Sequence, residues 1–216
     1  MKIFNVLSDK DIKSIKDAIS QTNWVDGKLS AIGAAKEKKD NLQISADNDI
    51  FKQHIQPIIN RVHKDPVITS YTFINDLIDP RLAMYRKMGK YDWHVDISIL
   101  AFKRTDLSWT ICLNDPDEYE GGELEIKSDA QSTKIKLKAG QMIVYPSGLL
   151  HKVNEVTSGE RLVIVGWINS HVKLHEHRER LYNFFLELNN FRNEFGPKKT
   201  NNLNQIYHQL VRDYST

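Results

Sequence analysis

The N-terminal part of the chain carries hydrophobic residues at helical spacing. Over residues 8–20 the isoleucines recur every three or four positions, which predicts an amphipathic helix. Ser8 can cap this helix, because Asp11 follows three residues later as in a capping box. A second helical pattern covers residues 48–63, and Pro57 inside it predicts a kink or a break.

The middle of the chain consists of short β-type segments separated by turn signals such as Asp79-Pro80 and Ser158-Gly159. The candidate strands are residues 67–73, 81–86, 91–96, 108–113, 122–126, 133–137, 141–145, 149–156 and 161–169. Many short strands at near-regular spacing predict a β-sandwich or an open barrel. Helical spacing returns after residue 172 and is interrupted at Gly196-Pro197. The expected fold class is therefore mainly β with flanking helices.

The stretch from Ser30 to Asn41 is polar, small and rich in lysine. This composition predicts a surface loop. Two interpretations are open for it: a mobile loop near an opening, or a solvated loop without a role.

Composition and charge limit the class of protein. The 216 residues are 40% hydrophobic and 27% charged, which is typical of one globular domain. A net charge of +2 gives no strong attraction to nucleic acid. The single cysteine, Cys112, excludes a disulfide framework and favours a reducing compartment. No apolar run approaches the roughly 18 residues of a membrane span, and charged residues come early, so we expect a cytoplasmic protein without a membrane partner.

Candidate chemistry begins at His94-Val95-Asp96. Residues two apart on a strand share a face, so an imidazole and a carboxylate are expected together. This motif alone is a weak signal, because alternating polar residues are common on exposed strands. His151 adds a third candidate ligand, since a histidine between apolar residues needs partners for both ring nitrogens. Two histidines and one carboxylate, with coordination positions left open, are typical of non-haem Fe(II) oxygenases.

Arg161 follows His151 by ten residues and enters an apolar run. It is either an arginine that reaches solvent from a strand end, or a guanidinium that grips a carboxylate with two hydrogen bonds. A dicarboxylate with a 2-keto acid end would bind the metal and Arg161 together, which describes 2-oxoglutarate. We expect His151 and Arg161 on adjacent antiparallel strands, facing one cavity. An odd-length loop or a bulge, with Gly159 at positive φ, would let them share a face.

Further motifs accompany these residues along nearly the whole chain. They are Trp24-Val25-Asp26-Gly27-Lys28, Leu113-Asn114-Asp115-Pro116, Tyr119-Glu120-Gly121-Gly122-Glu123-Leu124, Tyr145-Pro146-Ser147 and Ile206-Tyr207-His208. Together with His94, Asp96, His151 and Arg161, they resemble the Fe(II)/2-oxoglutarate-dependent hydroxylases of the prolyl-4-hydroxylase type. More narrowly, the chain resembles the bacterial PKHD-type hydroxylases.

The resemblance implies a double-stranded β-helix, or jelly-roll, core with N-terminal helices and a C-terminal helical extension. We expect one domain, in which residues 1–66 form a supporting region of helices and loops. Residues 67–172 would form the jelly-roll core, and residues 173–216 the helical extension. The extension departs from other prolyl-hydroxylase-like enzymes, which suggests a lid or the surface of a homodimer.

The resemblance also implies the chemistry of the site. The metal ligands that it implies for Fe(II) are His94, Asp96 and His151. The cofactor-binding residues that it implies are Arg161 and Tyr85 on the distal carboxylate of 2-oxoglutarate, with Tyr91 and Trp167 lining the pocket. A substrate would be hydroxylated with O₂ and 2-oxoglutarate as cosubstrates and with release of succinate and CO₂. Ascorbate would re-reduce the iron.

Two alternatives stay open from the sequence. A cupin-like or jelly-roll binding module could hold a structural metal without redox turnover, with Arg161 on some other carboxylate. The substrate of an enzyme is also open: a prolyl or other residue of a protein, a small molecule, or a nucleobase. The near-neutral charge argues against nucleic acid.

Overall fold

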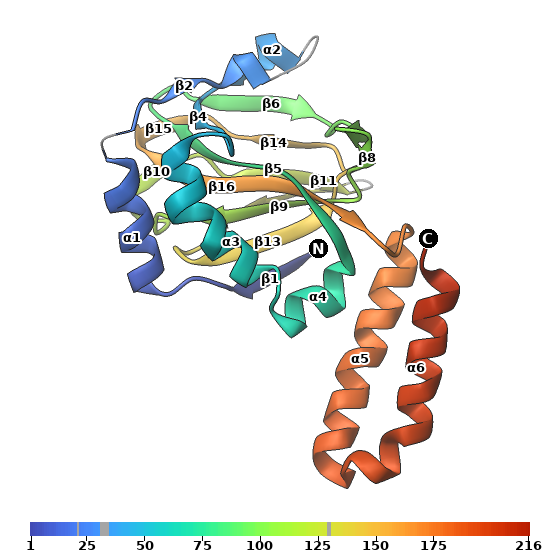
Figure 1. Ribbon diagram of the computed structural model, residues 1–216. Helices are drawn as coiled ribbons and strands as arrows, with labels where there is room; N and C mark the ends of the chain where they lie inside the picture. The colour runs from blue at the N-terminus through green and yellow to red at the C-terminus, as the bar shows by residue number, and fades with distance from the viewer. Residues whose placement is uncertain (21, 31–34, 129–130) are drawn as a thin grey trace.

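A computed structural model describes residues 1–20, 22–30, 35–128 and 131–216. Two antiparallel sheets face each other, and helices cover the outer face of the larger sheet (Figure 1). The architecture confirms the expected jelly-roll core, mainly β with helices at both ends.

Among the described residues, the larger sheet has seven strands and the smaller sheet has five. The larger sheet runs in the order β1 (Lys2–Asn5), β13 (Gln141–Pro146), β9 (Leu107–Cys112), β16 (Arg161–Ser170), β5 (Ile74–Tyr85), β4 (Leu42–Ile44) and β2 (Val25–Asp26). The smaller sheet runs in the order β12 (Gln131–Ile135), β11 (Leu124–Ser128), β14 (His151–Val153), β6 (Lys90–His94) and β3 (Lys39–Asp40). The short pairs are β10 (Tyr119–Gly121) with β15 (Val156–Gly159), and β7 (Ile99–Leu100) with β8 (Lys103–Arg104).

Residues 1–66 contribute strands as well as helices. β1 pairs with β13 at one edge of the larger sheet, while β2 and β4 extend the other edge. β3 pairs with β6 in the smaller sheet. The N-terminal region is thus part of both sheets and more than a support of helices and loops. The division of the domain at residues 66 and 172 stays a prediction.

The first predicted helix is present as α1 (Asp9–Ile19), with its capping box. The Ser8 side chain accepts from the backbone N–H of Asp11, and the Asp11 carboxylate accepts from the backbone N–H of Ser8 at 2.9 Å. The second predicted helix is interrupted, as expected: a π-helical turn, η2 (Phe51–Ile55), precedes α3 (Gln56–Val62). Pro57 directly follows this turn within a continuous helical run over residues 49–62, and its missing N–H removes one hydrogen bond from that run.

The predicted strand over residues 67–73 is wrong, because this segment forms α4 (Pro66–Thr72). The Asp65 side chain caps the helix by accepting from the backbone N–H of Val67 at 2.8 Å. Pro66 stands in the first turn, where its fixed φ favours a helix. The β-branched composition suggested a strand, but the cap, the proline and the tertiary contacts of α4 outweigh that preference.

Of the predicted loop over residues 30–41, residues 31–34 lie outside the described part. The short helix η1 (Gly27–Ser30) precedes them, and α2 (Ala35–Lys38) and β3 follow. β3 pairs Lys39 with Tyr91 of β6, so this segment adds an edge strand to the smaller sheet.

The predicted adjacency of the strands that carry His151 and Arg161 is wrong. His151 begins β14 in the smaller sheet, whereas Arg161 begins β16 in the larger sheet, opposite Tyr85 of β5. The intervening β15 pairs with β10, and the expected bulge is present there at Thr157, as is the positive φ of Gly159, 72°. The link between β14 and β16 therefore crosses from one sheet to the other, which the assumption of a simple hairpin missed.

The C-terminal helices form a hairpin that extends away from the two sheets (Figure 1). It comprises α5 (His175–Phe195), the short helix η3 (Pro197–Thr200) and α6 (Asn201–Tyr214). Gly196 ends α5 at a φ of 81°, as the Gly196-Pro197 signal predicts. Within the described residues, none of the helices combines the length and the apolar character that crossing a bilayer requires.

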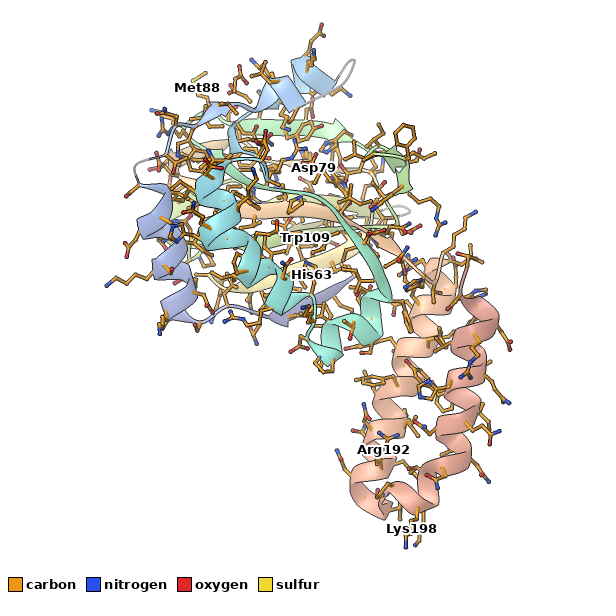
Figure 2. All side chains as sticks on the ribbon, viewed as in Figure 1. His63, Asp79, Met88, Trp109, Arg192 and Lys198 are labelled. Atoms are coloured by element: carbon orange, nitrogen blue, oxygen red, sulfur yellow. The ribbon has the colours of Figure 1, made fainter. Side chains whose placement is uncertain are left out.

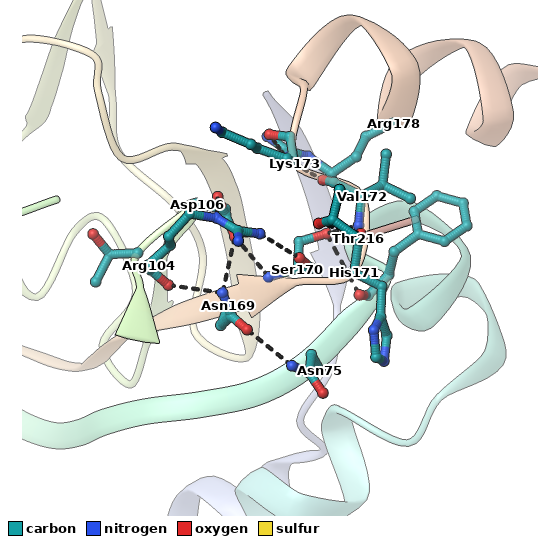
Figure 3. Close-up of polar contacts among 12 residues, drawn as sticks. Asn75, Arg104, Asp106, Asn169, Ser170, His171, Val172, Lys173, Arg178 and Thr216 are labelled. Atoms are coloured by element: carbon teal, nitrogen blue, oxygen red, sulfur yellow. Dashed lines mark hydrogen bonds and ion pairs between the residues drawn. The ribbon is translucent and has the colours of Figure 1, made fainter. Parts of the chain in front are cut away.

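A polar network ties the base of this hairpin to the end of β16 (Figure 3). The backbone N–H of Ser170 donates to Asp106 Oδ2 at 2.8 Å. Arg178 of α5, which is buried, donates to the backbone carbonyls of Val172 and Lys173 at 2.6 and 2.9 Å. These bonds fix the start of the hairpin relative to the larger sheet.

His63 lies at the end of α3 on the helix-covered side of the larger sheet, next to Trp109 (Figure 2). The two ring centroids are 5.0 Å apart, and His63 is 3% exposed. Neither ring nitrogen has a hydrogen-bond partner among the described residues. Burial therefore lowers the pKa of His63 to about 4.

This burial predicts acid sensitivity. The unfolded chain binds a proton at His63 below a pKa of about 6.5, whereas the folded chain does so only below about 4. The contribution of the neutral, buried His63 to the free energy of unfolding is fully present above pH 6.5 and is lost as the pH falls toward 4. Between pH 7 and pH 5, the free energy of unfolding should fall by about 2 kcal/mol more in the native protein than in His63→Phe, measured by urea unfolding. Equal losses in the two proteins would contradict this role of His63.

Candidate active site

A cavity that is partly open to solvent lies between the two sheets. Its walls come from both sheets, and it collects every residue that the sequence indicated for chemistry. These residues are Tyr85, Tyr91, His94, Asp96, His151, Arg161 and Trp167.

The strand pairing of the smaller sheet brings the three candidate metal ligands together. His94 ends β6 and His151 begins β14, and the two are direct partners in the antiparallel register. Asp96 lies two residues beyond the end of β6, so an irregular segment and not the expected strand face carries its carboxylate. The Nε2 atoms of His94 and His151 each lie 3.7 Å from an oxygen of Asp96, Oδ1 and Oδ2 respectively. A single divalent ion can bridge three groups at such spacing.

Both imidazoles turn the same nitrogen toward Asp96. Nδ1 of His94 lies 2.8 Å from the backbone carbonyl of Asp92, and Nδ1 of His151 lies 2.9 Å from that of Leu149. Because a carbonyl oxygen only accepts, each Nδ1 must carry the proton. Each Nε2 is then left with a lone pair, which is the state in which histidine binds a metal.

The surroundings of His94 keep its imidazole neutral and oriented. Burial, followed by the nearby His151, lowers the pKa of His94 to about 4. The Tyr91 ring stacks on the His94 ring, with centroids 3.6 Å apart and planes inclined by 16°. At neutral pH this imidazole is therefore available as a ligand without first losing a proton.

Ser108 of β9 fixes the carboxylate of Asp96 from the larger sheet. Its hydroxyl lies 2.5 Å from Asp96 Oδ2 and 2.8 Å from Ser147 Oγ. A hydroxyl has one proton to donate, so Ser108 donates to the carboxylate and accepts from Ser147. Both serines are buried, and the pair orients Asp96 between the two histidines.

Arg161 is a cation buried in another part of the same cavity. It is 3% exposed, and its Nη1 has no hydrogen-bond partner in the described part of the chain. Its guanidinium carbon lies 5.2 Å from the centroid of Tyr85, its partner across the strand pair. Burying such a donor without a partner is unfavourable, which makes a carboxylate of a ligand the natural complement.

Several cavity residues were given no role from the sequence. They are Lys39, Gln43, Arg81 and Ser108, and Tyr145 was noted only as part of the motif Tyr145-Pro146-Ser147. Burial, followed by Arg81, lowers the pKa of Lys39 to about 8, so its ammonium is still charged at neutral pH. Arg81 could have been found, because it stands four residues before Tyr85 and alternation puts both on one face. Lys39 is one of several lysines in the polar stretch over residues 30–41, where a solvated loop was the default interpretation, and its place in the cavity depends on the pairing of β3 with β6.

The donor set fits the group that the sequence suggested. Two neutral imidazoles and one carboxylate suit a divalent ion such as Fe(II), whereas calcium and magnesium prefer oxygen ligands. A structural zinc site takes four protein ligands, and three are grouped here among the described residues. The open coordination positions and the unpartnered Arg161 together suit a chelating dicarboxylate.

Comparisons with known proteins give the family of the chain. Residues 80–169 match the model of the 2OG-Fe(II) oxygenase superfamily. A PKHD-type hydroxylase of Shewanella frigidimarina is 32% identical, over 99% of this chain and 98% of the relative. A PKHD-type hydroxylase of Prochlorococcus marinus (strain MIT 9301) is 36% identical, over 98% of this chain and 97% of the relative.

Solved structures show the same fold. The crystal structure of a Pseudomonas putida prolyl-4-hydroxylase matches with a TM-score of 0.58 and 16% identity, over 78% of this chain and 91% of that chain. A 2OG-Fe(II) oxygenase family oxidoreductase of Burkholderia pseudomallei matches with a TM-score of 0.57 and 16% identity, over 76% and 81% of the two chains.

The chain belongs to the PKHD-type hydroxylases of the 2OG-Fe(II) oxygenase superfamily. It is a dioxygenase that uses Fe(II), 2-oxoglutarate and O₂. The alternative of a metal-containing binding module without turnover is not favoured.

The hydrogen bond from Ser108 predicts a measurable effect on metal affinity. In Ser108→Ala the Asp96 carboxylate loses its fixed orientation, so affinity for Mn(II) should fall about tenfold, measured by calorimetry. Ser147→Ala is the matched control, because Ser147 contacts Ser108 and its loss should have a smaller effect. An unchanged affinity in Ser108→Ala would exclude the orienting role.

Proposed function

We propose that His94, Asp96 and His151 bind the Fe(II) of this dioxygenase. The observation that carries the proposal is the pair of Nε2 atoms, each 3.7 Å from a different oxygen of Asp96. Both Nδ1 atoms are committed to backbone carbonyls, which leaves the metal-binding nitrogens free. Three ligands from the protein leave the remaining coordination positions to the cosubstrates.

Arg161 in this proposal binds the distal carboxylate of 2-oxoglutarate, with Tyr85 beside it. The proposal is supported by the burial of Arg161, by its unpartnered Nη1 and by its place in the same cavity as the three ligands. Burial raises the pKa of Tyr85, so its phenol keeps the proton that it can donate. A guanidinium and a phenol on neighbouring strands can then bind one carboxylate.

When bound, Fe(II) together with 2-oxoglutarate and O₂ supplies the oxidising chemistry of hydroxylation, with succinate and CO₂ as coproducts. The chain itself orients the ligands and limits the access of water. Tyr91 fixes the plane of the His94 ring, and Ser108 fixes Asp96. Apolar side chains of both sheets, Leu124, Val153 and Val165, line the cavity between the polar groups.

The primary substrate in this proposal is a prolyl or other residue of a protein, with a small molecule as the second candidate. Nucleic acid is not proposed, because the net charge is only +2. Trp167 lines the pocket in this proposal, together with Tyr91. Ascorbate as a reductant of the iron and a cytoplasmic location complete the proposal.

A homodimer through α5 and α6 is supported by the exposure of Phe191 and Phe195, which are 44% and 40% exposed.

The proposal is tested with the full chain, Fe(II), 2-oxoglutarate and O₂. Succinate should form, and Asp96→Ala should abolish its formation, because two imidazoles alone give too few ligands. Mass spectrometry of cell extracts and peptides for a product one oxygen heavier would identify the substrate. Succinate formation by Asp96→Ala at the native rate would reject this metal site.

Replacing Arg161 should separate cosubstrate binding from metal binding. Arg161→Ala leaves a buried carboxylate of the cosubstrate unpaired, at a cost of roughly 2–5 kcal/mol, so the KM for 2-oxoglutarate should rise at least about 30-fold. Affinity for Mn(II) should stay within about twofold of the native value, because Arg161 is not a ligand. Arg161→Lys should also be impaired, since a point charge does not replace the planar fork. Equal losses of metal and cosubstrate binding would make Arg161 a structural residue.

A further inference from the structure

A second group of side chains lines the cavity, and of these the function proposed above uses only Trp167, as part of the pocket wall. We call Lys39, Gln43, Arg81 and Trp167 the Arg81 cluster. Lys39 comes from an edge strand of the smaller sheet, and the other three come from β4, β5 and β16 of the larger sheet. The cluster therefore spans both walls of the cavity.

Hydrogen bonds connect the members of the Arg81 cluster across the two sheets. Lys39 Nζ donates to Ser30 Oγ at 2.9 Å, and Ser30 Oγ donates to Gln43 Oε1 at 2.7 Å. Arg81 Nη1 donates to the same Gln43 oxygen at 3.2 Å. These bonds run to neutral groups and cancel neither charge, so Lys39 keeps its charge, whereas Arg81 has a separate ion pair with Asp79.

A backbone irregularity positions Arg81. Opposite Gly166 of β16, strand β5 has two residues, Asp79 and Pro80, which makes a bulge directly before Arg81. Asp79 has a φ of 47°, an unfavourable conformation for a residue with a side chain, above all before a proline. Its carboxylate pairs with Arg81 Nη2. Bulges and left-handed residues of this kind re-aim side chains at functional sites.

Two N–H donors of the Arg81 cluster are buried without a hydrogen-bond partner among the described residues. Arg81 is 8% exposed, and its Nε has no hydrogen-bond partner among the residues that the structure describes. The indole Nε1 of Trp167 is buried and also unpartnered within that part of the chain. The two groups are neighbours, since the guanidinium carbon of Arg81 lies 5.6 Å from the Trp167 ring centroid. A pair of buried donors at one place calls for an acceptor from outside the chain.

The charges of the cavity define what that acceptor is. With the cosubstrate bound, the two charges of Fe(II) and the charge of Arg161 balance Asp96 and both carboxylates of 2-oxoglutarate. Asp79 balances Arg81. The ammonium of Lys39 remains, and no described carboxylate forms an ion pair with it. One positive charge is thus left beside two unused N–H donors.

We propose that the Arg81 cluster binds a carboxylate of the primary substrate and so selects a substrate with an acidic group close to the carbon that is oxidised. A carboxylate carries one negative charge and two oxygens in a plane, which matches one unbalanced ammonium and two neighbouring donors. A dianionic phosphate would leave one charge unmatched in a buried site. The inference rests on the proposed function, because the balance of charges assumes Fe(II) and 2-oxoglutarate at their proposed places.

The test uses the full chain loaded with Mn(II), which is paramagnetic, and saturating 2-oxoglutarate. Binding of both is measured first on the same sample. N-acetylglycine is then compared with its neutral amide, and N-acetylaspartate α-methylamide with its asparagine counterpart. The first pair represents a free or terminal carboxylate, and the second represents an acidic side chain in a peptide. Faster relaxation of the probe's methyl protons, relative to a Zn(II)-loaded control, reports binding near the metal.

In at least one pair, Mn(II) should speed the relaxation of the methyl protons of the acidic probe, and it should leave the relaxation of its neutral partner unchanged. Lys39→Met and Arg81→Met should each lower the affinity for the acidic probe about tenfold or more. Affinity for Mn(II) and 2-oxoglutarate should stay within about twofold in both variants. Lys87→Met, which changes an exposed lysine outside the cavity, should behave as the native protein.

Three results would overturn the inference. They are the absence of acidic-probe relaxation in the native protein, equal relaxation by acidic and neutral probes, and unchanged relaxation in both variants. A loss of 2-oxoglutarate affinity in Arg81→Met as large as in Arg161→Ala would assign Arg81 to the cosubstrate. Failure of the native protein to bind Mn(II) or 2-oxoglutarate is a separate result, which would reject the proposed function itself.

Discussion

The antiparallel register of β6 and β14 is the constraint on which the candidate site depends. It makes His94 and His151 direct partners, so their side chains leave the smaller sheet on the same face. Since side chains alternate along a strand, a slip by one residue would turn one imidazole to the outside. β11 pairs with β14 on one side and β3 with β6 on the other, which secures the register. The same pairing with β3 carries Lys39 to the cavity.

The larger sheet supplies the second wall and most of its charge. β16 pairs with β9 and β5 on its two sides, so its backbone is fixed over nearly its whole length. Alternation along this strand turns Arg161, Val165 and Trp167 toward the cavity, while Leu162, Ile164 and Ile168 pack into the hydrophobic cluster on the helix-covered side. A buried guanidinium with an unpartnered donor lowers the stability of the folded chain, and a rigid central strand makes this tolerable. Ligand binding explains why such groups are kept at this place.

Local sequence signals predicted those parts of the fold that local interactions decide. The capping box of Ser8 and Asp11, the break at Pro57 and the end of α5 at Gly196 all depend on contacts within one or two helical turns. The helix α4 shows where composition alone misleads, because one cap at Asp65 and its tertiary contacts outweigh β-branched residues. The position of Asp96 beyond the end of β6 likewise depends on where the strand pairing stops.

The sequence by itself determined the chemical types and the family: two histidines, a carboxylate and an arginine at spacings that only a small class of proteins shares. It could not determine that His151 and Arg161 lie in different sheets, because the short link between them is equally compatible with a hairpin. Nor could it place Lys39 beside Arg81, which are far apart along the chain. Pairing of distant strands decides both, since a strand's partner is chosen by burial and register over the whole domain and not by its neighbours in sequence.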